Sequence, residues 1–387
     1  MAARRVVAVS ATGRPNGQDG RVRILIAPDK FAGTLTAPQA AEAIARGWLR
    51  RRPDDQVELC PMSDGGPGFI DALHAALGGE LHEVEVPGLA GPAVTARYLL
   101  VDRTAYVESA QAVGLDQVPA ERRTPMTSSS FGLGLILRAA LDAGARRIVV
   151  GVGGTATNDG GAGLLAALGA GAEGARLDGG PEGLTGLTSV DLAEARAAVA
   201  DVALVVATDV DTQLLGLIGA TKTFGPQKGL SEEELLIADA RLQRLAECTD
   251  RRLATAPGAG AGGGIGFALM LLGAEREPGI GLIAATLGLA ERAASADLVL
   301  TGEGSFDFSS RAGKVPYGVA EIAGAALRPC VVLAGRVLIG AREMRALGVE
   351  AGYAMSDLAG EERSLAEPEA VLADLAERVA RTWAIGE

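Results

Sequence analysis

The chain has few of the residues on which several common kinds of functional site depend. Its 387 residues include three cysteines and two histidines, and no pair of them has the spacing of a structural zinc site. Three scattered cysteines are typical of a reducing compartment, so we expect a cytoplasmic protein. Lysine occurs only four times among 36 basic residues, and aromatic residues make up 3% of the chain. Each lysine is therefore a candidate for a position that needs a compact ammonium group.

The chain also has fewer basic than acidic residues. The 36 basic and 48 acidic residues give a formal net charge of −12. Nucleic acids and anionic membranes both attract basic surfaces, so we expect neither as a partner. An uncharged stretch over residues 253–274 contains Pro257 and a dense glycine cluster, which makes it a poor bilayer helix. Residues 1–20 lack the apolar core of a signal peptide and are expected to form a flexible extension.

Glycine, by contrast, is abundant, with 54 residues, and short apolar segments alternate with alanine-rich ones. This alternation predicts a mainly parallel α/β sheet. The expected strands are residues 22–27, 57–62, 147–152, 202–207, 298–301 and 331–334. The expected helices are residues 38–51, 162–168, 232–247, 318–327 and 368–383. Residues 82–110 have the pattern of antiparallel strands, which indicates a second domain inserted into the first.

Most of the expected strands are followed by glycines and a carboxylate. These carboxylates are Asp29, Asp64, Asp159, Asp209, Asp211, Glu303 and Asp307. Ligands of open α/β sheets bind beyond the carboxyl ends of the strands, so the pattern favours a ligand site rich in carboxylates. Each residue on its own is as well explained by helix capping or by a solvated loop.

A glycine-rich segment at residues 151–163, GVGGTATNDGGAG, has the composition of a turn that directs backbone N–H groups at a phosphate. Asp159 could instead simply cap the next helix. The segment also matches a dinucleotide fingerprint from Gly151 to Ala156, with Glu173 at a suitable distance for a ribose contact. A Rossmann-type NAD(P)-dependent oxidoreductase acting on a small hydroxy acid is therefore an alternative. A non-catalytic protein that binds an anionic metabolite is another.

Two further segments have the residue types of a phosphate site. Residues 221–229, TKTFGPQKG, place Lys222 and Lys228 around an expected turn, where they would either neutralise an anion or lie in solvent. Residues 257–266, PGAGAGGGIG, either approach a nucleotide or permit close packing.

The stretch around Lys314 contains no P-loop and no protein-kinase signature. Strand-end carboxylates, glycine-rich loops and sparse lysines together favour phosphoryl transfer. That reaction depends on positioning, Mg²⁺ and cations rather than on covalent chemistry from the protein.

At these motifs the chain resembles the bacterial type-1 glycerate kinase family. The matching stretches, in the family's order, are residues 26–37, 62–73, 151–163, 207–211, 224–229, 257–266 and 302–314. The resemblance implies ATP-dependent phosphorylation of D-glycerate with Mg²⁺, commonly to 2-phosphoglycerate. It also implies two α/β domains with the site in the cleft between them. The expected flavodoxin-like domain comprises residues 21–65 and 285–387, and the inserted domain comprises residues 66–284.

The resemblance also suggests a role for each matching residue. The expected catalytic residues are Asp64, Asp159, Asp209, Lys228 and Lys314. The expected nucleotide-binding residues are Gly153, Gly154, Thr155, Asn158, Gly260, Gly262 and Glu303. The expected metal ligands are Asp209 and Asp211. The general base, the phosphorylated hydroxyl and the formation of homo-oligomers stay open.

The chain departs from the family's usual pattern at several positions. Where many relatives have lysine, glutamate, arginine and glutamine, this sequence has Ala32, Pro67, Ser305 and Ser309. These departures bear on the substrate more than on the type of reaction.

Overall fold

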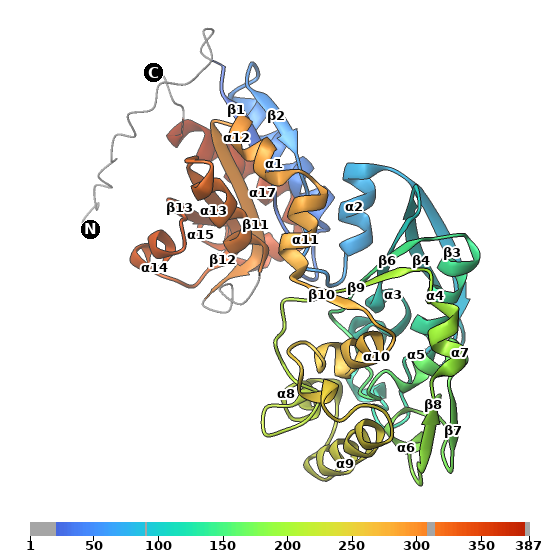
Figure 1. Cartoon of the computed structure of the whole chain (residues 1–387). Helices are drawn as coiled ribbons and strands as arrows, with labels where there is room; N and C mark the ends of the chain where they lie inside the picture. The colour runs from blue at the N-terminus through green and yellow to red at the C-terminus, as the bar shows by residue number, and fades with distance from the viewer. Residues whose placement is uncertain (1–20, 90, 308–313, 384–387) are drawn as a thin grey trace.

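The computed structural model describes residues 21–89, 91–307 and 314–383. The expected N-terminal extension, residues 1–20, and Ser309 lie outside these ranges. Two separate sheets form the two lobes of the molecule (Figure 1). We call the lobe built from both ends of the chain the host lobe, and the lobe built from its middle the inserted lobe.

The host lobe contains a five-stranded, wholly parallel sheet in the order β13-β12-β11-β1-β2. Its strands are β1 (Arg23–Ile26), β2 (Gln56–Leu59), β11 (Leu298–Phe306), β12 (Cys330–Val337) and β13 (Ala351–Ala354). Read from β2, this order is that of a flavodoxin-like doubly wound sheet, in which the chain reverses direction across the sheet between β1 and β11. The expected parallel α/β fold is therefore confirmed.

Helices cover both faces of the host sheet. On one face, α1 (Ala37–Arg51) and α17 (Pro368–Thr382) pack on side chains of β1, β11 and β12. On the other face lie α12 (Leu289–Ser295) and α13 (Val315–Ala325). Successive residues of each strand thus point into two different apolar cores, as expected for a central parallel sheet.

Helix α1 shows how local sequence produces such an element. Thr36 and Gln39 form a capping box, which satisfies backbone N–H groups that have no partner within the first turn. Ile44 and Trp48 follow at helical spacing and are fully buried against the sheet. The Trp48 indole N–H donates to Asp55 over 2.9 Å, so its single polar atom is also satisfied.

The inserted lobe contains a six-stranded mixed sheet in the order β10-β9-β6-β5-β4-β3. Its strands are β3 (Glu80–Val86), β4 (Val94–Val101), β5 (Thr104–Glu108), β6 (Arg147–Gly151), β9 (Ala203–Ala207) and β10 (Glu275–Glu277). The β3–β4 and β4–β5 pairs are antiparallel, as predicted for residues 82–110, and the other pairs are parallel. A hairpin of β7 (Gly171–Glu173) and β8 (Ser189–Asp191) projects from this lobe.

The remaining described helices complete the two lobes. In the inserted lobe they are α3 (Ser109–Val113), α4 (Phe131–Asp142), α5 (Ala162–Ala167), α6 (Gly180–Gly183), α7 (Ala193–Ala198), α8 (Ala220–Lys228), α9 (Glu232–Cys248) and α10 (Ile265–Leu271). In the host lobe they are α14 (Ala341–Ala346), α15 (Met355–Ala359) and α16 (Glu361–Ala366). Among the described residues, no helix combines the length and the hydropathy needed to cross a bilayer.

The prediction of a turn at residues 221–229 is wrong, because this segment forms helix α8. The Gly-Pro pair suggested a break, yet Pro226 lies in the last turn, and the helix ends where Gly229 adopts φ 100°. Gly225 has no side chain at the point where α8 meets Leu235 of α9, which permits their close packing.

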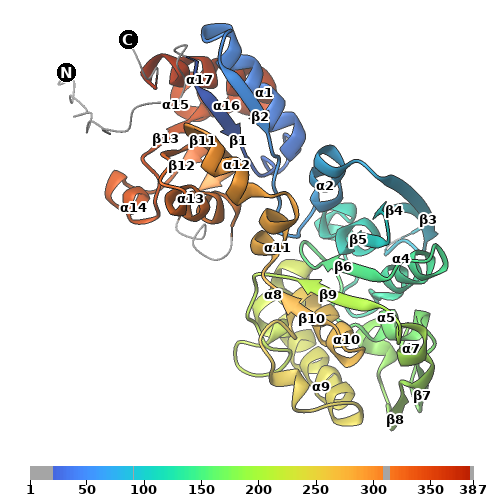
Figure 2. The same ribbon diagram turned by 45° about the horizontal axis from the view of Figure 1, so that its top comes forward.

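The two lobes share an apolar core. Two helices, α2 (Phe69–Leu77) and α11 (Gly279–Thr286), lie at the junction in both views (Figures 1 and 2). Phe69 and Ile283 belong to the same buried cluster as Tyr106 of the inserted sheet, and the Phe69 and Tyr106 rings meet edge to face at 6.1 Å. This packing fixes the carboxyl ends of the host strands opposite the inserted lobe.

Candidate active site

Three carboxylates meet where the lobes face each other. Asp29 and Asp64 follow β1 and β2 of the host lobe, and Asp209 follows β9 of the inserted lobe. Asp64 interacts electrostatically with both of the others. The predicted site residues Asp64 and Asp209 are therefore brought together from the two lobes. We call the place where Asp29, Asp64 and Asp209 meet the cleft edge. Asp29 was not among the predicted site residues, although its position directly after a strand was the available signal.

Burial shifts the ionisation of two of these carboxylates. It raises the pKa of Asp29, which is 7% exposed, to about 7; Lys30 opposes the shift, and Asp64 and Glu303 add to it. Burial also raises the pKa of Asp209 to about 6, against hydrogen bonds from the backbone N–H groups of Ile280 and Gly279. Burial is the main cause of both shifts and the charge of Asp64 adds to each, so a cation bound here would stabilise the ionised carboxylates.

Lysines border the same edge. Lys314 stands at the start of α13, with its Nζ atom 3.6 Å from Glu303 Oε2 and 3.8 Å from Asp307 Oδ1. A Cβ atom added to Gly66 would lie 2.9 Å from Asp64 Oδ1 and 3.7 Å from Lys30 Nζ, so Lys30 also reaches this edge. The predicted residues Glu303 and Lys314 are therefore neighbours, and Lys30 is a further cation that the predicted set omitted.

Asp159 and Lys228 occupy a different place, inside the inserted lobe. Asp159 accepts hydrogen bonds from the N–H and hydroxyl of Ser130 and from the N–H groups of Gly161 and Gly163. Burial raises its pKa, and these four donors oppose the shift. Gly161 rather than Asp159 is the N-cap of α5, although Asp159 accepts the N–H of Gly163 in the first turn of that helix. The Asp159 carboxylate has no exposed surface through which it could touch a substrate.

Lys228 binds the glycine-rich segment of residues 151–163 through two hydrogen bonds. Its side chain is 2% exposed, and Nζ donates to Thr157 O over 2.6 Å and to Thr155 Oγ1 over 3.3 Å. Burial lowers the pKa of Lys228 to about 7, and the nearby Asp159 opposes this shift. Asp159 and Lys228 are thus placed to position the loop rather than to contact the reacting atoms.

We expect Lys228 to make stability depend on pH. Its pKa is lower in the folded chain than in the unfolded one, so the unfolded chain binds more protons between pH 7 and pH 10. The unfolding free energy of the wild type should therefore rise relative to that of Lys228→Met, by up to about 1.4 kcal/mol per pH unit. Urea denaturation at pH 7, 8 and 9 measures this difference, and a difference independent of pH would contradict it.

Asn158 and Thr157 carry polar atoms without a partner. Asn158 Nδ2 donates to Thr221 Oγ1 over 3.0 Å. Asn158 Oδ1 and Thr157 Oγ1 are buried and have no hydrogen-bond partner among the described residues. Buried polar atoms are nearly always satisfied, so these two mark a place where a water or a ligand atom would be stabilised.

The glycines that were predicted to lie against ATP lie against other segments of this chain in the structure. A Cβ atom at Gly153 would lie 2.8 Å from Gly66 Cα, and one at Gly154 would lie 2.7 Å from Pro67 Cγ. Likewise, the Gly260 N–H donates to Thr212 O over 2.8 Å.

Gly262 is packed in the same way, because an added Cβ would lie 2.5 Å from Val152 Cγ1. These glycines permit close packing of loops, which was the alternative interpretation of residues 257–266. Their contact with a nucleotide stays a prediction.

Asp211, the second predicted metal ligand, lies on the surface and is paired with an arginine. Its side chain is 79% exposed and forms an ion pair with Arg276 at 2.7 Å. Within the described ranges, no three carboxylate, histidine or cysteine side chains are arranged to hold a metal ion by themselves. Mg²⁺ in phosphoryl-transfer sites needs only one or two carboxylates, because phosphate oxygens and waters complete its coordination. The carboxylates of Asp29, Asp64 and Asp209 suit that role, and the role of Asp211 stays a prediction.

The dinucleotide interpretation of residues 151–163 is wrong. Strand β6 ends at Gly151, and the next helix, α5, begins only at Ala162, so the glycine turn does not open a helix as the fingerprint requires. Glu173 lies on β7, where it is exposed and accepts a hydrogen bond from Ser189.

A flavodoxin-like parallel sheet and a second, mixed sheet from the middle of the chain, with carboxylates and lysines gathered where the two lobes meet, define an α/β protein with a charged site at the junction. The model of the glycerate kinase family matches residues 24–384. Glycerate 2-kinase of Escherichia coli (strain K12) is 39% identical over 344 residues, which are 86% of this chain and 90% of that protein. Glycerate kinase of Bacillus subtilis (strain 168) is 37% identical over 344 residues, with the same shares.

A solved structure agrees with these sequence comparisons. A chain assigned as glycerate kinase 2 from Salmonella typhimurium LT2 superposes with a TM-score of 0.79 at 37% identity, covering 93% of this chain and 98% of that one. The chain therefore belongs to the glycerate kinase family, and it is a kinase.

Proposed function

We propose that this enzyme transfers the γ-phosphoryl group of ATP to D-glycerate with Mg²⁺ and forms 2-phosphoglycerate. One observation carries the proposal: carboxylates from both lobes, Asp29, Asp64 and Asp209, meet at one edge beside Lys30 and Lys314. This is the donor set that phosphoryl transfer requires. The 2-phosphoglycerate product is supported by the E. coli relative, which is a glycerate 2-kinase.

Each residue of the edge has a distinct role in this proposal. Asp29 and Asp64 hold Mg²⁺, which neutralises charge on the transferring phosphoryl group when it is bound. Lys30 and Lys314 bind phosphate oxygens. Asp209 accepts the proton of the glycerate hydroxyl, because a pKa of about 6 leaves its carboxylate ionised at neutral pH while keeping it basic.

The buried groups of the inserted lobe act through the loop that they hold. Asp159 and Lys228 fix residues 153–163, and this loop supports the Gly66–Pro67 turn that carries Asp64. Thr155 of this loop accepts a hydrogen bond from Lys228, and Asn158 donates one to Thr221 of α8. We assign all four to positioning.

A coupled assay with ATP, Mg²⁺ and D-glycerate tests the activity, and phosphorus NMR of the product tests the position of the phosphate. We expect ADP formation that depends on D-glycerate, with a phosphomonoester on the 2-hydroxyl. Absence of turnover would contradict the proposed reaction. A product phosphorylated on the 3-hydroxyl would contradict the proposed regiochemistry.

Mg²⁺ should stabilise the protein more at pH 8 than at pH 5.5. At the lower pH, Asp29 is largely protonated, since its pKa is about 7, and the ion must displace this proton to bind. Melting temperatures measured with and without Mg²⁺ at both pH values test this. Asp29→Asn should remove most of the shift at pH 8. Asp211→Asn serves as a matched comparison, and loss of the shift there would make Asp211 a ligand.

A further inference from the structure

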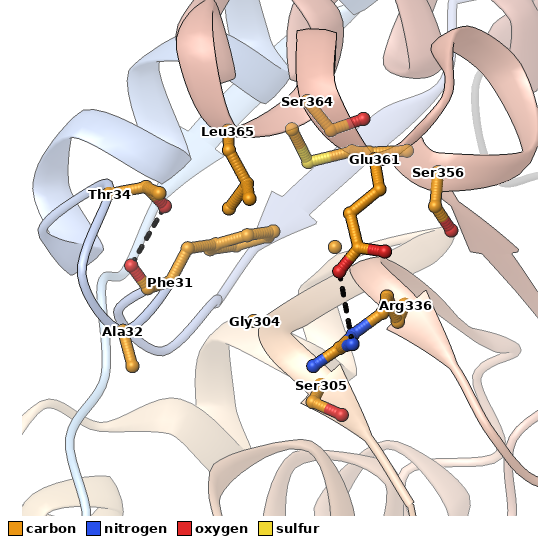
Figure 3. A pocket seen from close by; sticks show the side chains of 12 residues that line it. Phe31, Ala32, Thr34, Gly304, Ser305, Arg336, Ser356, Glu361, Ser364 and Leu365 are labelled. Carbon is orange, nitrogen blue, oxygen red and sulfur yellow. Dashed lines mark hydrogen bonds and ion pairs between the residues drawn. The ribbon is translucent and has the colours of Figure 1, made fainter.

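A cavity of about 300 Å³ opens on the host lobe, and Figure 3 shows the side chains that line it. It lies at the carboxyl ends of β1, β11 and β12, and α15 and α16 close its far side. Its walls include Phe31 and Ala32 after β1, Ser305 of β11, Arg336 of β12 and Leu365 of α16. Strands β1 and β11 flank the point where the sheet order reverses, which is where doubly wound sheets bind ligands.

Two charged side chains that line this cavity, Arg336 and Glu361, form an ion pair with each other. At its mouth, Arg336 Nη1 lies 3.2 Å from Glu361 Oε1, and Figure 3 shows the two groups facing each other. Among the residues that the structure describes, no other charged side chain lines this cavity. A small anion such as glycerate would meet no cation here that lacks a counter-charge. A neutral group could bind without burying an unpaired charge.

The interior combines an apolar surface with polar edges. Phe31 and Met355 are almost fully buried beneath it, while Leu365 faces Phe31 in Figure 3 and is 61% exposed. Ser305 and Ser356 add hydroxyl groups at the border. Such a lining suits a flat, partly apolar molecule with polar edges, which is the chemistry of a nucleoside, and the volume lies in the range of small-ligand pockets.

Residues of the cavity wall are close neighbours, along the chain, of residues at the charged edge. Lys30 immediately precedes Phe31, and Glu303, the partner of Lys314, precedes Ser305 by two residues on β11. A ligand with its neutral body in the cavity could therefore extend a polyanionic tail to these two lysines.

We propose that this cavity holds the adenosine part of ATP, with the triphosphate extending along the cleft edge to Lys30 and Lys314. This proposal rests on the proposed function. It places the nucleotide on the host lobe rather than at the glycine loops of Gly153 and Gly260, which contact the chain itself. The acceptor then lies across the cleft, on the side of Asp209.

Photolabelling of the wild-type enzyme with 8-azido-ATP and Mg²⁺ tests the location directly. The label should appear in tryptic peptides 31–46 or 364–378, which contain cavity residues, and excess ADP should suppress it. A label confined to peptides 148–176 or 253–276, which contain the glycine loops, would overturn the proposal.

A cavity-filling variant tests the same point through binding. Ala32 is exposed at the cavity wall, so Ala32→Trp should cover the cavity and raise the Kd of ADP at least tenfold, with the KM of D-glycerate unchanged. Ala197→Trp is the matched control, because Ala197 is exposed on α7 of the inserted lobe. Equal melting temperatures would show that both variants fold.

The outcomes separate this proposal from the proposed function. Unchanged ADP affinity in Ala32→Trp, or a rise in the KM of D-glycerate alone, would overturn the adenosine assignment even if the enzyme turns over. ADP binding and labelling at the cavity in an enzyme that does not phosphorylate D-glycerate would support the assignment and reject the proposed substrate.

Discussion

Replacing Asp209 with asparagine is expected to lower the kcat for D-glycerate phosphorylation by about 10²- to 10⁴-fold, the usual contribution of a general base. An amide cannot accept the hydroxyl proton, whereas its oxygen can still accept the N–H of Ile280, which lies 3.2 Å from Asp209 Oδ2. The variant should therefore fold normally and keep its KM for ATP. Steady-state kinetics with each substrate varied in turn measure both effects.

Two comparisons make this result specific. Asp211→Asn changes an exposed carboxylate two residues away and should leave kcat within a factor of about three, since surface ion pairs contribute little. The kcat of the wild type should rise with pH up to about 6, as Asp209 ionises, and then level off. If Asp209→Asn also lost the stabilisation by Mg²⁺, Asp209 would be a metal ligand instead. A variant with wild-type kcat would exclude both roles.

The second large effect is expected from a single methyl group at the junction of the lobes. A Cβ atom at Gly279 would overlap the carbonyl oxygen of Asp64 and lie 3.0 Å from Asp209 Oδ2. Gly279→Ala must therefore move Asp64 relative to Asp209, and a displacement of about 1 Å in a catalytic site costs roughly 10² in rate. We expect a loss of that size in kcat, measured in the coupled assay.

The same helix provides the control for this experiment. Gly281 also lies in α11, but an added Cβ would meet no atom closer than Pro278 Cβ, at 3.7 Å. Gly281→Ala should keep full activity and melt slightly higher, because alanine favours the helix. Equal kcat values for the two variants would show that the close approach at Gly279 does not hold the carboxylates in place.

Local patterns were sufficient to predict much of the fold. Helix α1 was expected at residues 38–51 and spans Ala37–Arg51, because Thr36, Gln39 and Trp48 encode its start and its buried face within one stretch of sequence. The failures came where tertiary contacts overrode such signals. Strand β11 was expected to end at residue 301 and continues to Phe306, since its glycines pair with β12 instead of turning away.

The candidate site was predictable only in part. Residue types at strand ends indicated Asp64 and Asp209, but their meeting depends on how α2 and α11 pack the lobes together, which no local pattern encodes. For the same reason, sequence patterns could not distinguish Asp159 and Lys228, which are buried in the inserted lobe, from the residues of the cleft edge. Their burial results from the close packing of α8, α9 and the loop of residues 153–163.

The connectivity of the host sheet has a consequence for the synthesis of this protein. Ile24 of β1 pairs with Leu298 of β11, 274 residues further along the chain. Between the emergence of β2 and that of β11 the ribosome adds roughly 240 residues, which takes on the order of 10 to 50 s at usual translation rates. Throughout that time one edge of β1 has no partner, while every strand of the inserted sheet has already emerged before β11. The nascent chain therefore completes its middle first, and until β11 emerges the open edge of β1 is exposed to pairing with other chains.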